Sequence, residues 1–179
     1  MKMTKKYKKK FLNILIILIV LLLAPITSSA EIGDKKWTKE CNKDNKKVCL
    51  IAINNQVAIP GSDKKQTLAT AIIQLASTTK LKEESKIVPV LIVRFPLNVD
   101  LTKKPLIQID KKNVLNIPFS HCNPDDGCVT RLTINDEVIK LFKSGKELTL
   151  VMGVFRSKDN LTVTLPLKGF SKAYDSLLK

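Results

Sequence analysis

Residues 118–134 read PFSHCNPDDGCVTRLTI, and they combine a turn signal with a strand signal. The Asn-Pro-Asp-Asp-Gly run between Cys122 and Cys128 consists of residues that favour tight turns. After Cys128, apolar and polar residues alternate, so that Arg131 and Thr133 share one face. The stretch therefore predicts a turn that leads into a β-strand with one exposed face.

Similar strand-like runs recur on both sides of this stretch, separated by turn-forming residues. The pattern predicts seven or eight strands and an all-β domain, an antiparallel sandwich or barrel. Pro89 lies inside one run and suggests an edge strand or a bulge, because proline cannot donate to a sheet ladder. The predicted strands cover 48–54, 67–76, 87–95, 106–110, 114–119, 128–134, 147–155 and 161–167.

Two stretches have helical periodicity instead. In 135–146, acidic residues come first and Gly145 follows the apolar stripe, which predicts a short helix near 136–143 capped by Asn135 or Asp136. A second helix is predicted over 169–179, with Ser171 as its N-cap, and it would cover an open end of the sheet pair. We expect both apolar stripes to contact the core rather than a partner. The stripes consist of Val138, Ile139 and Phe142, and of Phe170, Ala173, Tyr174 and Leu177.

Residues 1–30 have the pattern of a secretory signal peptide. Six lysines within the first ten residues precede an apolar run at 11–24, and Ser28 and Ala30 satisfy the small-residue rule for cleavage. That run of 14 residues is shorter than the ~20 that a membrane-spanning helix needs, which favours cleavage after Ala30 over retention as an anchor. The mature chain, 31–179, is then expected to form a single domain.

The four cysteines are expected to form disulfides, because an exported chain meets an oxidising compartment. Four cysteines allow three pairings, and the sequence alone does not select one of them. The spacing favours two local bridges, each closing a hairpin-like loop of polar and turn-forming residues. The two favoured pairs are Cys41 with Cys49 and Cys122 with Cys128.

Metal and redox sites are the alternatives for the region around the second pair. Its cysteines are six positions apart, which matches neither a zinc-binding pair nor a C-x-x-C redox motif. Asp125 and Asp126 are adjacent, whereas a calcium loop needs acidic residues at alternating positions. His121 is the only histidine of the chain and has no evident catalytic partner. We therefore predict no catalytic residue, no metal ligand and no cofactor site.

The net charge indicates which partners are expected. The whole chain carries +15, and removal of the signal peptide leaves 25 basic and 16 acidic residues, a net charge of +9. Attraction to anionic lipid, polysaccharide or nucleic acid is one interpretation of this charge. The lysines are scattered between apolar runs, however, which is typical of a solvated surface. No specific nucleic-acid partner is predicted.

Several sequence blocks occur in a fixed order: Trp37 four positions before Cys41, CLIAI from Cys49, IPFSHCNPDDGCVTRLTI, VIKLFKSGKELTLVM and LTVTLPLKGFSKAYDSL. The most specific parts are Phe-x-x-Cys-x5-Cys and Leu-x-Gly-Phe-x-x-Ala. This set, which covers 37–178, resembles the invasion-associated locus B (IalB) family of exported bacterial proteins. The resemblance implies an immunoglobulin-like β-sandwich, and it supplies no catalytic residues.

The resulting functional hypothesis is an exported, non-enzymatic binding or accessory protein of the bacterial envelope. The periplasm is favoured as its location, with attachment to the outer membrane or the cell surface as alternatives. Its partner would be another envelope protein or component, and an exposed sheet edge is one way to contact it. Two other hypotheses remain: a surface adhesin, suggested only by the family name, and a structural envelope protein without a discrete ligand.

Overall fold

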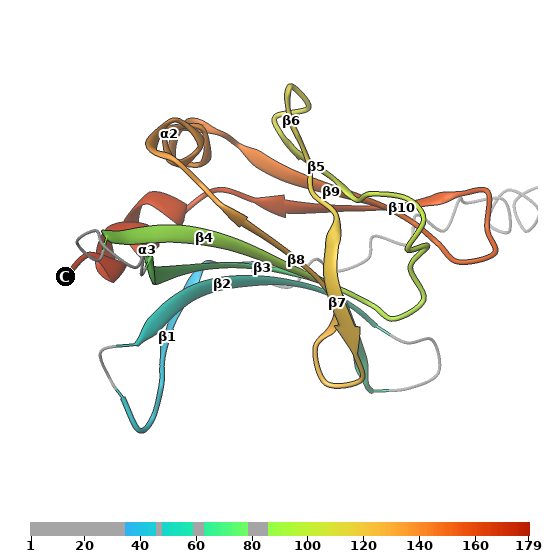
Figure 1. Ribbon diagram of the computed structural model, residues 1–179, viewed down its shortest axis with the longest axis horizontal. Coiled ribbons are helices and arrows are strands. Elements are labelled where there is room, and N and C mark those ends of the chain that lie inside the picture. The colour runs from blue at the N-terminus through green and yellow to red at the C-terminus, as the bar shows by residue number, and fades with distance from the viewer. Residues whose placement is uncertain (1–34, 46–47, 59–62, 79–85) are drawn as a thin grey trace, which may run out of the picture. The chain divides into compact units, whose positions relative to one another are not determined.

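The structure is a computed structural model that describes residues 35–45, 48–58, 63–78 and 86–179. The predicted signal peptide, 1–30, lies outside the described residues and stays a prediction, as does the single-domain assignment. The described residues contain ten strands and two helices (Figure 1). Every strand pair is antiparallel, and the strands form two sheets that face each other across a common core. The predicted all-β sandwich class is confirmed.

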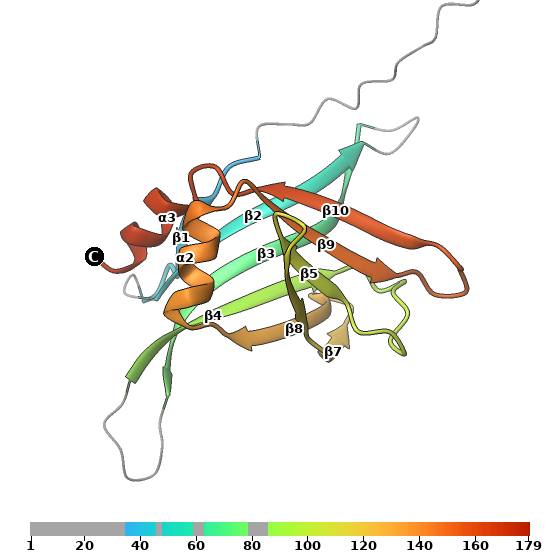
Figure 2. The same cartoon turned by 90° about the horizontal axis from the view of Figure 1, so that it is seen from above.

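The larger sheet has six strands in the order β1-β2-β3-β4-β8-β7, and the smaller sheet has four in the order β10-β9-β5-β6 (Figure 2). Strands β1 and β7 are therefore the two edges of the larger sheet. The larger sheet consists of β1 (Thr38–Cys41), β2 (Cys49–Ala58), β3 (Lys65–Thr78), β4 (Lys86–Phe95), β7 (Phe119–Asn123) and β8 (Gly127–Thr133). The smaller sheet consists of β5 (Leu106–Ile109), β6 (Asn113–Asn116), β9 (Glu147–Gly153) and β10 (Asn160–Pro166).

The eight predicted strand regions all contain strands, whereas β1 and β7 are additional. Both are short and almost entirely polar at the surface, so they lack a clear apolar alternation. Strand β4 as a whole lies between β3 and β8, but its first residues, 86–89, pair in a ladder with β3 alone, so Pro89 lies on a locally open side of the strand. The β4–β8 ladder ends beside Pro89, at the pair Val90 and Thr133, so no ladder hydrogen bond needs the N–H that proline lacks. The Pro89 carbonyl accepts a hydrogen bond from the Ile134 N–H at 3.0 Å.

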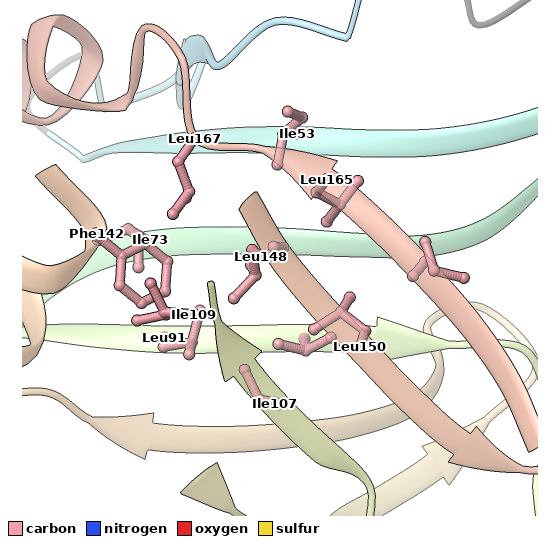
Figure 3. Close-up of a cluster of buried hydrophobic side chains, with 14 of the residues drawn as sticks. Ile53, Ile73, Leu91, Ile107, Ile109, Phe142, Leu148, Leu150, Leu165 and Leu167 are labelled. Carbon is pink, nitrogen blue, oxygen red and sulfur yellow. The ribbon is translucent and has the colours of Figure 1, made fainter. Parts of the chain in front are cut away.

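The core lies between the two sheets, and alternate residues of the inner strands supply most of it (Figure 3). On β5 and β9, every second residue points inward, and these side chains are at most 2 % exposed. Burying an isoleucine or leucine side chain contributes about 1.5–3 kcal/mol, so this layer carries much of the stability. The fully buried residues include Ile51, Ile53, Ile73, Leu91, Ile107, Ile109, Phe142, Leu148, Leu150, Met152, Leu165 and Phe170.

Helix α2 (Asp136–Ser144) follows β8 and buries Ile139 and Phe142 in the core. Asn135 is its N-cap, since its side-chain oxygen accepts the N–H of Val138 at 3.0 Å. At the other end, the Gly145 N–H donates to the Leu141 carbonyl at 2.8 Å. The predicted short helix and one of its two proposed caps are therefore present.

Helix α3 (Phe170–Leu177) ends the fold and buries Phe170 and Tyr174. The predicted cap Ser171 is wrong: the N-cap is Gly169, which makes no side-chain hydrogen bond. The chain reverses direction between β10 and α3 with Gly169 at φ +88°, a left-handed conformation that glycine adopts without steric cost. The Ser171 hydroxyl instead donates to the Lys143 carbonyl at 3.4 Å, across to α2.

An aromatic cluster joins the beginning of the described chain to its end. The Phe170 ring meets Trp37 edge-on at 5.0 Å between centroids, packs against Phe142 at 5.0 Å and stacks on Tyr174 at 5.7 Å. The indole N–H of Trp37 donates to the Pro166 carbonyl at 3.1 Å. Trp37 is therefore a structural anchor that holds the segment before β1 against α3.

Candidate functional site

Two disulfides tie the edge strands of the larger sheet to their inner neighbours. Cys41 on β1 is bonded to Cys49 on β2, and Cys122 on β7 is bonded to Cys128 on β8. Each pair is directly opposed in the strand register, with 4.0 Å between the Cα atoms. This is the local pairing that the sequence spacing favours.

The turn between Cys122 and Cys128 is organised by its own polar side chains. The side-chain oxygen of Asn123 accepts the backbone N–H groups of Asp125 and Asp126, at 3.0 and 2.7 Å. Gly127 has φ +74°, and a Cβ atom there would overlap the Phe95 carbonyl oxygen, so only glycine fits. These contacts favour a structural turn rather than a metal or redox site.

This turn is also fixed to the centre of the sheet. The Asp126 carboxylate lies 3.0 Å from the guanidinium of Arg94, a residue of β4. Cys128 itself is only 1 % exposed and belongs to the hydrophobic core. The turn is therefore held from three directions: by its disulfide, by Asn123 and by the ion pair.

His121 is exposed on β7, beside this disulfide. Its Nδ1 is 3.2 Å from the hydroxyl oxygen of Ser120, and that hydroxyl donates its proton to the Val129 carbonyl at 2.9 Å. The Ser120 hydroxyl proton is therefore directed at a backbone carbonyl rather than at the imidazole. A histidine that activates a serine nucleophile must instead accept the hydroxyl proton of that serine.

No group of three or more His, Cys, Asp or Glu residues is placed to hold a metal ion within the described part of the chain. No helix among the described residues is long and apolar enough to cross a membrane. Among the residues that the structure describes, two carboxyl groups and one phenol have shifted pKa values. Burial, above all, raises the pKa of Tyr174, whereas the backbone N–H groups of Glu147 and then Lys146 lower the pKa of Asp110. A hydrogen bond from the Thr102 hydroxyl is the main cause of the lowered pKa of Asp100. All three are explained by neighbouring structural contacts.

A lysine-lined groove of about 700 Å³ runs beside Trp37, between the segment before β1 and the start of α3. None of its lining residues is acidic, so their ammonium groups create a positive field that attracts anions. Lys39 also donates a hydrogen bond to the Ser176 carbonyl. The lysines that line the groove are Lys35, Lys36, Lys39, Lys168 and Lys172.

Two further grooves lie at the ends of the larger sheet. One, of about 1260 Å³, runs between the two helices and the ends of β1 to β4, with Ile87 and Leu178 on its surface. The other, of about 530 Å³, separates residues 101–104 from residues 118–122 and is lined by Lys103, Lys104 and His121. All three grooves have lysine side chains on their walls.

The sequence profile described as "Invasion associated locus B (IalB) protein" matches residues 37–178. The chain belongs to the IalB family. A crystal structure of invasion associated protein B from Bartonella henselae has a similar fold, with a TM-score of 0.60 and 20 % sequence identity. The similarity covers 80 % of this chain and 92 % of that one. No curated protein sequence matches the chain.

The residues that carried the sequence resemblance have structural roles in this IalB-family protein. Trp37 and Phe170 meet in the aromatic cluster, and the two cysteines of the Phe-x-x-Cys-x5-Cys element close a hairpin. Phe119 of the same element packs edge-on against Phe95 at 5.8 Å. Sequence reasoning missed the Arg94–Asp126 pair, because it joins β4 to the turn between β7 and β8 and leaves no local signal. It placed Asn123 in the turn, but it did not predict that an asparagine follows the first cysteine of both bridges.

Proposed function

We propose that this IalB-family chain is an exported, non-enzymatic protein of the bacterial envelope that acts by binding another envelope component. The observation that carries the proposal is the pair of disulfides, Cys41–Cys49 and Cys122–Cys128, at both edges of one sheet. Disulfides of this kind form and persist in oxidising compartments and are rare in the cytosol. The signal-peptide pattern of residues 1–30 supports the same assignment.

The chemistry of the described surface supports binding rather than catalysis. Ser120, which lies within hydrogen-bond distance of His121, directs its hydroxyl proton to the Val129 carbonyl rather than to the imidazole. Three grooves with lysine on their walls provide binding surfaces for anionic or amphiphilic components. The periplasm is the favoured location within this proposal.

A surface adhesin is the second candidate. The similar Bartonella henselae protein is described as invasion associated, and that description applies to that protein. At 20 % identity the likeness establishes a common fold only. A structural envelope protein without a discrete ligand is the third candidate. The two edge strands of the larger sheet, each bonded to its inner neighbour by a disulfide, are compatible with it.

The deciding experiment measures protease accessibility and thiol state in the producing bacterium. We expect the protein to resist added protease on intact cells, to be cleaved once the outer membrane is opened, and to contain no thiol that reacts with an alkylating reagent. The matched control lacks residues 2–30, and it should remain in the cytoplasm with four reactive thiols. Cleavage on intact cells would favour the adhesin, whereas a reduced cytoplasmic protein would overturn the proposal.

A further inference from the structure

Three large apolar side chains are exposed at one end of the sandwich. Leu97, Leu101 and Phe155 are 55 %, 60 % and 59 % exposed, although isolated examples on a surface need no explanation. These three lie on two loops, 97–104 and 153–159, which we call the loop end. The loop end is far from the helices: in both views it lies where β9 meets β10, opposite α2 and α3 (Figures 1 and 2).

The two loops of the loop end are joined to each other by backbone contacts. Val99 forms an antiparallel bridge with Val154, and Val99 itself is buried. The Phe155 N–H donates to the Asn98 carbonyl at 2.8 Å, and the Asp100 N–H donates to the Gly153 carbonyl at 2.8 Å. The three exposed apolar side chains therefore lie on two loops that are held together by backbone hydrogen bonds.

Basic side chains surround these apolar ones. Residues 97–104 and 153–159 contain Lys103, Lys104, Arg156 and Lys158 against two acidic residues, Asp100 and Asp159. Lys103 is 3.5 Å from the Asp100 carboxylate, and the guanidinium of Arg156 lies over the Phe155 ring at 5.2 Å from its centroid. The two linked loops thus combine exposed apolar side chains with a net positive charge.

A groove opens directly beside Leu101. It has a volume of about 530 Å³, and Leu101, Lys103 and Lys104 line one wall while Ser120 and His121 of β7 line the other. Two ammonium groups and an imidazole in a hollow next to an exposed leucine suit a ligand that is anionic at one end and apolar at the other. A phospholipid headgroup at a bilayer surface has that composition.

We propose that the loop end docks on the surface of an anionic phospholipid bilayer. Leu97, Leu101 and Phe155 enter the boundary between headgroups and acyl chains, and the groove of Lys103 and Lys104 contacts the headgroup phosphates. Apolar side chains supply affinity in proportion to the area that they bury, and lysines near an anionic leaflet add an electrostatic attraction. The inference deepens the proposed function, because it rests on export and names the envelope component.

The composition of the loop end favours a bilayer over a protein partner. Its charge comes mainly from lysine, a flexible point charge that interacts with many phosphates without fixed geometry. The guanidinium of its single arginine, Arg156, lies over the Phe155 ring and is not paired there with a carboxylate of any described residue. Protein-binding hot spots, in contrast, are enriched in arginine, tyrosine and tryptophan.

The test is sedimentation with vesicles, using the exported protein purified with its disulfides intact. Vesicles of phosphatidylglycerol and phosphatidylcholine are compared with vesicles of phosphatidylcholine alone. We expect binding to the anionic vesicles, reduced at high salt, and little binding to the neutral ones. The double variant Leu101→Ser, Phe155→Ser should bind the anionic vesicles about tenfold more weakly.

The chain offers a matched control at the opposite end. Val48 and Leu178 are 44 % and 61 % exposed beside the helices, so Val48→Ser with Leu178→Ser removes similar apolar surface and should leave vesicle binding unchanged. A control for charge compares Lys103→Gln, Lys104→Gln with Lys111→Gln, Lys112→Gln, on the exposed turn between β5 and β6. Only the first of these pairs should weaken binding.

A fluorescence measurement reports insertion directly. Trp37 is the only tryptophan and is 8 % exposed, so its emission is a constant background. The variant Phe155→Trp should show a blue shift of the new emission when anionic vesicles are added, because its indole moves from water into the bilayer boundary. The parent protein should show no shift.

Each result supports or overturns the inference. Absence of binding to anionic vesicles, equal losses for the two apolar double variants, or an unshifted emission of Phe155→Trp would overturn it. Binding that depends on the lysines but not on Leu101 and Phe155 would also overturn it, since a soluble polyanion would then serve equally well. Failure here with a protein that is nevertheless oxidised and exported leaves the proposed function standing, whereas a reduced cytoplasmic protein removes that function whatever the vesicles show.

Discussion

The two disulfide-closed hairpins occupy opposite edges of the larger sheet and begin in the same way. In each, the first cysteine of the bridge is followed by an asparagine, Asn42 or Asn123. The Asn42 side-chain oxygen accepts the N–H groups of Asp44 and Asn45 at 2.8 and 3.2 Å, and Asn123 makes the equivalent two bonds at 3.0 and 2.7 Å. An edge strand has ladder bonds on one side only, and both bridges hold such a strand to its inner neighbour.

The surroundings of the two bridges differ. Cys41 and the rest of β1 are exposed, whereas Cys128 is 1 % exposed and belongs to the core. The second turn is also packed at Gly127 against the Phe95 carbonyl and is paired through Asp126 to Arg94. One disulfide therefore closes a hairpin at the surface, whereas the other contributes a cysteine to the core. We therefore expect substitutions in the second hairpin to lower the free energy of unfolding more than equivalent substitutions in the first.

The largest effect is expected at Gly127. The substitution Gly127→Ala places a Cβ atom on the Phe95 carbonyl oxygen at φ +74°, so the backbone of the turn must move. We expect a loss of about 3 kcal/mol or more in the free energy of unfolding, measured by urea denaturation. Gly169→Ala is the control, since φ is +88° but no atom lies within 4 Å of the added Cβ, and it should cost about 1 kcal/mol. Equal losses would mean that the second turn is not packed as described.

Removal of the two bridges compares the hairpins directly. Loop closure gives each bridge about 2 kcal/mol on the chain-entropy estimate, because the loops are of similar length. Cys122→Ala with Cys128→Ala also removes a core sulfur, so its loss should reach about 3 kcal/mol, while Cys41→Ala with Cys49→Ala should lose about 2 kcal/mol. Urea unfolding under non-reducing conditions measures both. A larger loss at the first bridge would contradict the assignment of the second to the core.

Sequence patterns predicted eight of the ten described strands because apolar alternation and turn residues are local signals. They predicted helix α2 and the cap Asn135 for the same reason. The order of the strands was not predictable, and Pro89 shows why: its position in a central strand depends on where the neighbouring strand ends, which is a fact of tertiary structure. Ser171 failed as a cap because the reversal after β10 requires a left-handed residue, and Gly169 supplies it.

The candidate binding surfaces were the least predictable part. Leu97 and Phe155 are more than 50 positions apart in the sequence, and the backbone contacts around Val99 and Val154 bring their loops together. The lysine-lined groove likewise combines Lys35 with Lys168. Scattered lysines in the sequence indicated a solvated surface, whereas folding gathers some of them on the walls of grooves.

The two asparagines provide a subtler comparison. Asn123→Ala leaves two N–H groups without their acceptor, one of them in a partly buried turn, so we expect a loss of about 1 kcal/mol in the free energy of unfolding. The bonds of Asn42 are exposed, and water replaces them, so Asn42→Ala should lose about half as much or less. Thermal unfolding of both variants beside the parent checks the order. The reverse order would place the more organised turn at the first hairpin.

The smallest effect is expected for the ion pair that joins the second turn to β4. Arg94 and Asp126 are 46 % and 35 % exposed, so solvent screens their attraction, and a double-mutant cycle of Arg94→Gln and Asp126→Asn should give a coupling of about 0.5 kcal/mol at low salt. The pair Lys143–Asp175, which joins the two helices at 2.7 Å with similar exposure, is the matched cycle and should give a similar value. Both couplings should shrink in high salt. A coupling several times larger for Arg94 and Asp126 alone would mean that charge, rather than the disulfide and the fit of Gly127, holds this turn against the sheet.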